Sequence, residues 1–264
     1  MQPTTNGIVT LTTDFGVQDL FVGVLKGVIL GINRVATLVD ITHGIPPQDI
    51  PTAALVVDAA SRCFPPGTVH VVVVDPGVGS ERRNIALACR GQYFVAPDNG
   101  VLTAVHADNP GVAVSLEETV FFRNPASATF HGRDIFAPVA AYLSRGTPLT
   151  SLGPTVTGLV CADLPQPTVS STAIDGQVLM VDHFGNLITN LPLPVAPEDA
   201  APLEGVVEIT GRNVPLRRTY ADVATGELVA LRGSSGTLEV SVNGSSAAAA
   251  LGISTGDVVT FRAY

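Results

Sequence analysis

This sequence is poor in features that define whole classes of protein. Lys26 is the only lysine, and Asp and Glu outnumber Lys and Arg by 23 to 14, which gives a net charge of −9. A nucleic-acid backbone or an anionic membrane surface requires a basic face on its partner, so we expect neither as a main partner. No apolar run approaches the roughly 18 residues that a membrane-spanning helix needs.

Cysteine and clustered histidine are also scarce. The cysteines are odd in number, lie far apart and form no CxxC pair, so neither a disulfide framework nor a thiolate zinc site is expected. The histidines show no HxH or HExxH spacing, which argues against a metal site. The N-terminus lacks the basic and apolar segments of a secretory signal, and we predict a cytoplasmic protein. The cysteines are Cys63, Cys89 and Cys161.

The first part of the chain alternates predicted strands and helices. Apolar residues recur at helical spacing between Leu20 and Ile32. Thr68–Val74 ends in four valines, which is typical of a strand buried on both faces of a parallel sheet. This order predicts a three-layer, Rossmann-like α/β domain over residues 1–162. The predicted strands are Ile8–Thr12, Ala36–Ile41, Thr68–Val74, Asn84–Cys89 and Gln92–Val95; the predicted helices are Leu20–Ile32, Pro51–Arg62 and Asp134–Arg145, the last capped by Gly146.

The pattern changes after residue 162. Residues 163–172 lie in a stretch rich in Pro, Ser and Thr, which favours an extended linker. Beyond it, short apolar strands alternate with turns rich in Gly, Asn and Pro, with no strong helix between them. Residues 173–264 are therefore predicted to form a small β domain, either a barrel or a sandwich. Its predicted strands are Gln177–Val181, Val206–Thr210, Leu228–Leu231, Thr237–Val242 and Asp257–Arg262.

Two aspartates follow predicted parallel strands, where open α/β sheets bind ligands. Asp14 follows the first strand and Asp75 follows the valine run. Aspartate is also a common turn former, so a structural role for either stays open. Arg82 lies seven residues after Asp75, beyond a glycine-rich turn, and can fold back to hold the carboxylate ionised and oriented. A purely structural salt bridge would have the same sequence signature.

Several long motifs in one order resemble the S-adenosyl-L-methionine hydroxide adenosyltransferases, the water-using relatives of the fluorinase and chlorinase enzymes. The match covers nearly the whole chain. Its landmarks are LTTDFG (Leu11–Gly16), VDITHGIPPQDI (Val39–Ile50), VDPGVGSERR (Val74–Arg83), APDNG (Ala96–Gly100), TFHGRDIFAP (Thr129–Pro138) and VDHFGNLITN (Val181–Asn190).

The resemblance implies roles for residues of the first domain. Asp75, Arg82 and His131 match the set that activates water in that family. Asp14 matches the aspartate that binds both ribose hydroxyls, and Phe130 matches an aromatic wall of the pocket. The resemblance also implies that residues 173–264 form a β-barrel-like domain. It further implies a homotrimer, with substrate between one subunit's N-terminal domain and its neighbour's C-terminal domain.

The second domain supplies the remaining implied contacts. Asp182 and Asn186 match residues that hold the two ends of methionine, with Phe184 beside them. Tyr220 matches the aromatic residue that stacks on adenine. Where the halogenating relatives carry Ser-Arg for methionine carboxylate and adenine, this chain carries Ser234-Ser235 and so lacks that guanidinium.

The departures from the halogenases favour water as the nucleophile. Those enzymes resemble one another in a tyrosine followed three residues later by a halide-contacting threonine or glycine. Asp75 and Val78 stand at these positions here, and Gly132 replaces a halide-binding serine. A carboxylate about 4 Å from a halide would repel it by roughly 4 kcal/mol at an effective dielectric of 20. Gln48 replaces a halogenase tryptophan.

We therefore predict an enzyme that hydrolyses S-adenosyl-L-methionine to adenosine and L-methionine, with no metal or other cofactor. Asp75 is predicted to act as hydrogen-bond acceptor and general base, with His131 sharing or relaying the proton. Arg82 either fixes Asp75 or stabilises hydroxide directly. Two alternatives remain: a halogenase of the same fold, and a non-catalytic sensor of S-adenosyl-L-methionine or adenosine.

Overall fold

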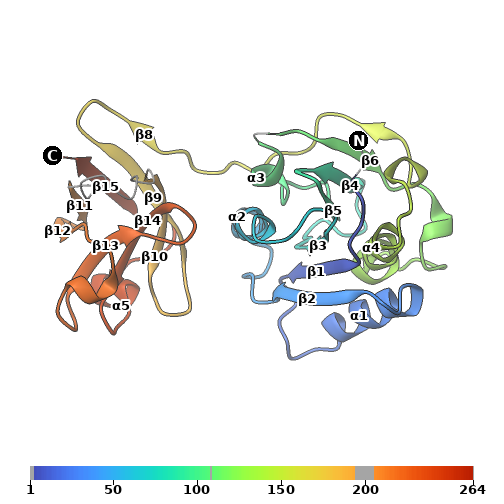
Figure 1. Ribbon diagram of the computed structural model, residues 1–264, viewed down its shortest axis with the longest axis horizontal. Helices are drawn as coiled ribbons and strands as arrows, with labels where there is room; N and C mark the ends of the chain where they lie inside the picture. Colours follow the sequence, from blue (N-terminus) through green and yellow to red (C-terminus); the bar gives the residue numbers. More distant parts are fainter. Residues whose placement is uncertain (1–2, 108, 194–204, 264) are drawn as a thin grey trace. The chain divides into compact units, whose positions relative to one another are not determined.

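The computed structural model describes residues 3–107, 109–193 and 205–263, and the chain divides into two compact units, Met1–Asp163 and Leu164–Tyr264 (Figure 1). The first unit is built on a seven-stranded sheet of order β2-β1-β3-β5-β4-β6-β7. Its elements are β1 (Ile8–Thr13), α1 (Phe21–Ile32), β2 (Thr37–Thr42), α2 (Ile50–Ser61), β3 (Val69–Val73), β4 (Asn84–Cys89), β5 (Gln92–Pro97), α3 (Thr103–His106), β6 (Val112–Ser115), α4 (Ala137–Ser144) and β7 (Thr155–Val156).

The sheet is covered on both faces. Strands β2, β1, β3 and β5 run parallel to one another, while the pairs β5–β4, β4–β6 and β6–β7 are antiparallel. Val71 and Val73 pack with α1 and α4, whereas Val72 and Val74 pack into a second core with α2 and α3. Figure 1 shows these helix pairs on opposite sides of the sheet. The three-layer α/β architecture and the doubly buried valine strand are confirmed.

Helix α4 begins at Ala137, three residues later than the predicted start at Asp134. The preceding residues, Gly132–Phe136, form a π-helical turn. Pro138 has no N–H, so it cannot donate to the carbonyl of Asp134 four residues earlier. That carbonyl accepts the backbone N–H of Arg123 instead, at 2.9 Å. The π-helical turn therefore precedes the α-helix, which ends at Ser144, one residue before the predicted end; Gly146 (φ +93°) follows the C-cap residue Arg145.

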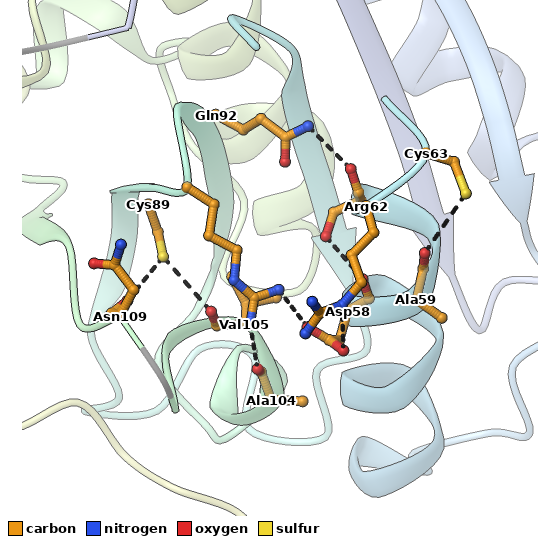
Figure 2. Close-up of polar contacts among 11 residues, drawn as sticks. Asp58, Ala59, Arg62, Cys63, Cys89, Gln92, Ala104, Val105 and Asn109 are labelled. Atoms are coloured by element: carbon orange, nitrogen blue, oxygen red, sulfur yellow. Dashed lines mark hydrogen bonds and ion pairs between the residues drawn. The ribbon is translucent and has the colours of Figure 1, made fainter. Parts of the chain in front are cut away.

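An ion cluster around Asp58 joins α2 to the β4–β5 hairpin (Figure 2). Asp58 pairs with Arg62 on its own helix and with Arg90 at the hairpin turn. Arg90 also donates to the carbonyl of Ala104 at 3.0 Å, which ties α3 to the same cluster. Cys89, beside Arg90, is a buried free thiol whose pKa is raised by burial. The cluster lies outside the pocket described below and fixes the helices on one face of the sheet.

The second unit is an antiparallel sheet whose strands follow the order β12-β11-β15-β9-β10-β14-β13, with β8 paired to β9. A bridge between Leu216 and Ala230 joins the two ends of this path, so the sheet nearly closes into a barrel, as predicted. The helix α5 (Ala247–Leu251) was not expected; Ser246 caps its start and Gly252 its end. The strands are β8 (Thr168–Val169), β9 (Ile174–Val181), β10 (Leu187–Pro192), β11 (Gly205–Ile209), β12 (Arg212–Pro215), β13 (Leu228–Arg232), β14 (Thr237–Val242) and β15 (Val258–Ala263).

Within these described residues, no helix combines the length and apolar character that a bilayer crossing requires.

Candidate active site

A pocket of about 270 Å³ lies at the carboxyl ends of β1 and β3 in the first unit. Asp14 and Asp75 both line it, because adjacent parallel strands end at the same edge of the sheet. Its other lining residues are Phe15, Gln48, Val73, Pro76, Val78, Thr129, Phe130, His131 and Gly132.

A bidentate ion pair joins Asp75 and Arg82. Arg82 Nε donates to Asp75 Oδ1 at 2.6 Å, and Nη2 donates to Oδ2. Both side chains are almost fully enclosed, at 5% exposure for Asp75 and 8% for Arg82. The fork of a guanidinium matches the two oxygens of a carboxylate, so this contact fixes the plane of the Asp75 carboxylate.

All of the N–H groups of Arg82 have partners within the protein. A guanidinium carries five such donors and no acceptor. Two serve Asp75, and Nη1 donates to Asn84 Oδ1 and to the carbonyl of Arg83. The last, on Nη2, lies 2.9 Å from His131 Nδ1. Arg82 therefore has no spare N–H for a ligand, although its charge still acts across the pocket.

The contact with Arg82 also defines the protonation of His131. Because a guanidinium only donates, His131 Nδ1 must accept, and the ring proton of the neutral imidazole lies on Nε2. Burial lowers the pKa of His131, the Arg82 charge lowers it further, and the charges of Asp75 and Asp134 oppose this in part. His131 is thus a neutral ring that offers an Nε2–H donor.

Phe130 and His131 are placed by the loop that precedes the π-helical turn. Asp134, at 1% side-chain exposure, accepts the backbone N–H of Ser127 at 2.8 Å. Arg133 forms a bidentate pair with Asp134 and lies over the Phe130 ring, 5.1 Å from its centre. The hydrogen bonds, ion pair and ring contact hold the loop to the start of the helix. Single π-helical turns are frequent at functional sites.

Asp14 is oriented by another residue that lines the pocket. Its Oδ2 accepts the backbone N–H of Gln48 at 2.9 Å, and Gln48 adopts a left-handed conformation with φ +65°. Phe15, Phe21 and Phe130 form a cluster of ring contacts beside it, with centroids 5.3 to 5.9 Å apart. Sequence reasoning overlooked Phe15 as a pocket residue; its position next to Asp14 was the available signal.

In the second unit, Asp182 and Asn186 meet at the turn between β9 and β10. Asp182 Oδ1 accepts the backbone N–H groups of Phe184 and Asn186, and Oδ2 accepts Asn186 Nδ2 at 2.9 Å. Phe184 is 75% exposed at the tip of the turn. This network makes Asp182 a turn former, and it also presents the Phe184 ring to the surroundings.

Tyr220 and the Ser234-Ser235 turn also belong to the second unit. The Tyr220 hydroxyl donates to Glu239 Oε1 at 2.7 Å, and Ser235 Oγ lies 3.1 Å from Thr237 Oγ1. Both serines are exposed. Glu239 was not among the predicted site residues, because a single glutamate within an apolar strand carries no motif.

The predicted site residues therefore fall into two groups. Asp14, Asp75, Arg82, Phe130 and His131 are together in the first unit, while Asp182, Phe184, Asn186, Tyr220, Ser234 and Ser235 lie in the second. In the part of the chain that the structure describes, no group of three or more His, Cys, Asp or Glu side chains is arranged to hold a metal ion.

The fold and the pocket define a protein with two units. The first is an α/β unit that carries a hydrogen-bonded aspartate, arginine and histidine at its pocket, and the second is a β unit. Comparison with known families identifies the protein further. Residues 9–153 match the SAM hydroxide adenosyltransferase N-terminal domain, and residues 176–260 match the SAM hydroxide adenosyltransferase C-terminal domain. The chain belongs to this family, and the resemblance seen in the sequence is confirmed.

Individual relatives agree with this assignment. The chain is 42% identical over 252 residues to a Thermus thermophilus protein named (R)-S-adenosyl-L-methionine hydrolase, covering 92% of this chain and 95% of the relative. A Nocardia brasiliensis fluorinase is more distant, at 30% identity over 287 residues, covering 93% and 94% of the two chains. The crystal structure of an uncharacterized conserved protein from Thermotoga maritima shares 39% identity with a TM-score of 0.89, covering 97% of this chain and 99% of that one.

Proposed function

We propose that this protein hydrolyses S-adenosyl-L-methionine, with the R configuration at sulfur, to adenosine and L-methionine. The observation that carries the proposal is the Asp75, Arg82 and His131 network at the wall of a pocket that also contains Asp14. The names of the hydrolase relatives support the substrate, and the sulfur configuration is taken from those names.

The reaction is a displacement at the 5′ carbon of the ribose. A water oxygen forms a bond to that carbon while the carbon–sulfur bond breaks, and its electron pair leaves with sulfur as a neutral thioether. The attacking water must lose a proton. Asp75 receives that proton through a carboxylate lone pair that Arg82 does not use. Holding one water in line with the sulfur can lower the activation barrier by several kcal/mol, and by about 7–11 kcal/mol at the best alignments.

The geometry separates the roles of Arg82 and His131. Arg82 orients Asp75 and His131, because all of its N–H groups have protein partners. His131 donates its Nε2–H to the attacking water and fixes a lone pair of that water toward the ribose carbon. In this scheme His131 positions the water without relaying its proton, and hydroxide is not bound directly by Arg82.

The remaining predicted site residues bind the substrate. Asp14, whose carboxylate is oriented by Gln48, accepts the ribose hydroxyls, and Phe130 forms an apolar wall. Asp182, Phe184, Asn186, Tyr220, Ser234 and Ser235 contact the methionine and adenine ends, with a serine pair in place of the Ser-Arg of the halogenating relatives.

Incubation in oxygen-18 water with each sulfur epimer separately tests this proposal. We expect adenosine labelled at the 5′ hydroxyl, unlabelled methionine, and faster turnover of the R epimer. Attack by water at the 5′ carbon places the label there because the 5′ hydroxyl oxygen of adenosine comes from solvent. The measurement is liquid chromatography with mass spectrometry of both products.

The same incubation distinguishes the alternatives. Halogenated adenosine from reactions in chloride or fluoride would identify a halogenase. Substrate that binds in calorimetry and stays intact would identify a sensor. Release of adenine in place of adenosine would contradict attack at the 5′ carbon.

We further propose a cytoplasmic homotrimer with active sites shared between subunits. The family resemblance supports the assembly, and three free thiols suit a reducing compartment. Mixing two inactive variants, one with Asp75→Asn and the other with Asn186→Ala, should restore measurable turnover after subunit exchange. Restoration requires that one site takes Asp75 and Asn186 from different chains. Activity no higher than that of the separate variants, at a mixed-trimer ratio verified by native mass spectrometry, would refute shared sites.

A further inference from the structure

A buried carboxylate in the second unit has no role in the reaction described above. Glu239 lies in β14 between Leu238 and Val240, both fully buried, and is itself only 6% exposed. Glutamate is almost never this buried unless its oxygens are paired. Its partners therefore indicate why the strand keeps a charge at this position.

Glu239 contacts two structures that carry predicted substrate residues. Its Oε1 accepts the Tyr220 hydroxyl at 2.7 Å and the Ser241 hydroxyl at 2.8 Å. Its Oε2 approaches Gly233 so closely that a Cβ added there would lie 3.0 Å away. Gly233 immediately precedes Ser234, so the same carboxylate contacts Tyr220 and packs against the turn that carries the two serines.

Tyr220 is held at its backbone and at its hydroxyl, while its ring remains partly exposed to solvent. At the backbone, Thr219 and Asp222 form a capping box around the short helix Tyr220–Asp222. At the hydroxyl, Glu239 is the acceptor, and 42% of the residue remains exposed. The hydrogen bond to Glu239 raises the pKa of Tyr220 to about 12, with burial and the charges of Glu239 and Asp182 acting in the same direction. The hydroxyl thus stays protonated as a permanent donor.

We propose that Glu239 is a positioning residue for substrate recognition, which anchors the hydroxyl of Tyr220 so that the ring is fixed in advance as a platform for the adenine. The inference rests on the proposed function, because it takes adenine as the planar group that meets Tyr220. A tyrosine anchored in this way loses little further rotational freedom when a base stacks on it. Glu239 acts on binding and not on the displacement step.

Because Glu239 acts on binding and not on the displacement step, its substitution should change KM and not kcat. Glu239→Ala should raise the KM for S-adenosyl-L-methionine and the Kd for adenosine about three- to ten-fold, the range for immobilising one side chain. The kcat should stay within about two-fold, because binding lost equally from ground state and transition state leaves kcat unchanged. Glu239→Gln keeps an oxygen acceptor for the hydroxyl and should restore most of the affinity.

Tyr220→Phe provides a second measurement if Glu239→Ala fails to fold. It keeps the ring but removes the anchored hydroxyl, and we expect a similar loss of affinity. In the Tyr220→Phe background, Glu239→Ala should add less than about two-fold, because the two changes remove one interaction. Glu208→Ala is the matched control: it removes an exposed carboxylate of the same unit, and affinity should not change.

Adenosine binding by calorimetry separates this inference from the proposed function, because it requires no turnover. Wild-type protein that binds adenosine, together with a folded Glu239→Ala variant that binds it equally well, would overturn the inference alone. The inference would also be overturned if Glu239→Ala and Tyr220→Phe each weaken adenosine binding and the two losses of binding free energy add fully in the double variant. Wild-type protein that binds neither adenosine nor S-adenosyl-L-methionine would overturn both.

Discussion

Asp75→Asn should lower kcat for S-adenosyl-L-methionine hydrolysis by about 10²–10⁴-fold, the usual contribution of a general base. In the wild type, two N–H groups of Arg82 donate to the Asp75 carboxylate, one to each oxygen. Asparagine matches aspartate in size and keeps one oxygen acceptor for Arg82. The amide cannot take the proton of the attacking water. The KM should change little, because Asp75 faces the water and not the bulk of the substrate. Steady-state kinetics with adenosine detection provides the measurement.

Asp58→Asn is the matched control for this change. Asp58, at 21% side-chain exposure, is another aspartate of the first unit that pairs with arginines, but it lies in the cluster that joins α2 to the β4–β5 hairpin (Figure 2). Its substitution should leave kcat within about two-fold of wild type. Undiminished turnover by folded Asp75→Asn protein would remove Asp75 as the base.

Arg82→Met should lower the free energy of unfolding of the first unit by about 3–5 kcal/mol at neutral pH. Methionine fills much of the same volume but leaves the Asp75 carboxylate, at 5% exposure, without its cation. It also removes the donors to Asn84 and His131. Turnover should fall with stability, because neither Asp75 nor His131 keeps its orientation. Denaturant unfolding followed by circular dichroism, at one fixed protein concentration, measures the stability.

Two further variants identify the cause of that loss. Adding Asp75→Asn to Arg82→Met removes the unpaired charge and should recover part of the stability while activity stays absent. Arg62→Met removes an arginine that is 55% exposed, and we expect a change of no more than about 0.5 kcal/mol. If the double variant is no more stable than Arg82→Met alone, the unpaired charge is not the source of the destabilisation.

Local sequence patterns were sufficient for most of the fold. The valine run predicted a doubly buried strand, and the structure divides its side chains between two cores. The start of α4 could not be placed from periodicity, because it depends on which backbone donor meets the carbonyl of Asp134. That donor is Arg123, eleven residues earlier in the chain. Periodicity describes one segment at a time and carries no information about such a partner.

The site shows the same division. The order of motifs identified the family and singled out Asp75, Arg82 and His131 as a set. The tautomer of His131, the pairing of every Arg82 donor and the anchoring of Tyr220 depend on contacts between residues separated by between 1 and 49 positions. Sequence alone left open whether Arg82 fixes Asp75 or holds hydroxide, and the geometry favours the first.

The sequence by itself therefore determined the fold class, the family and the chemical types of the predicted site residues, because these depend on residue identity, spacing and order. Only the tertiary structure decided how their protons and hydrogen bonds are distributed. A hydrogen bond depends on distances of about 3 Å and on direction, and both arise only when strands distant in the chain end side by side. For that reason the water-handling set could be named from the sequence, while the part each member plays required the folded protein.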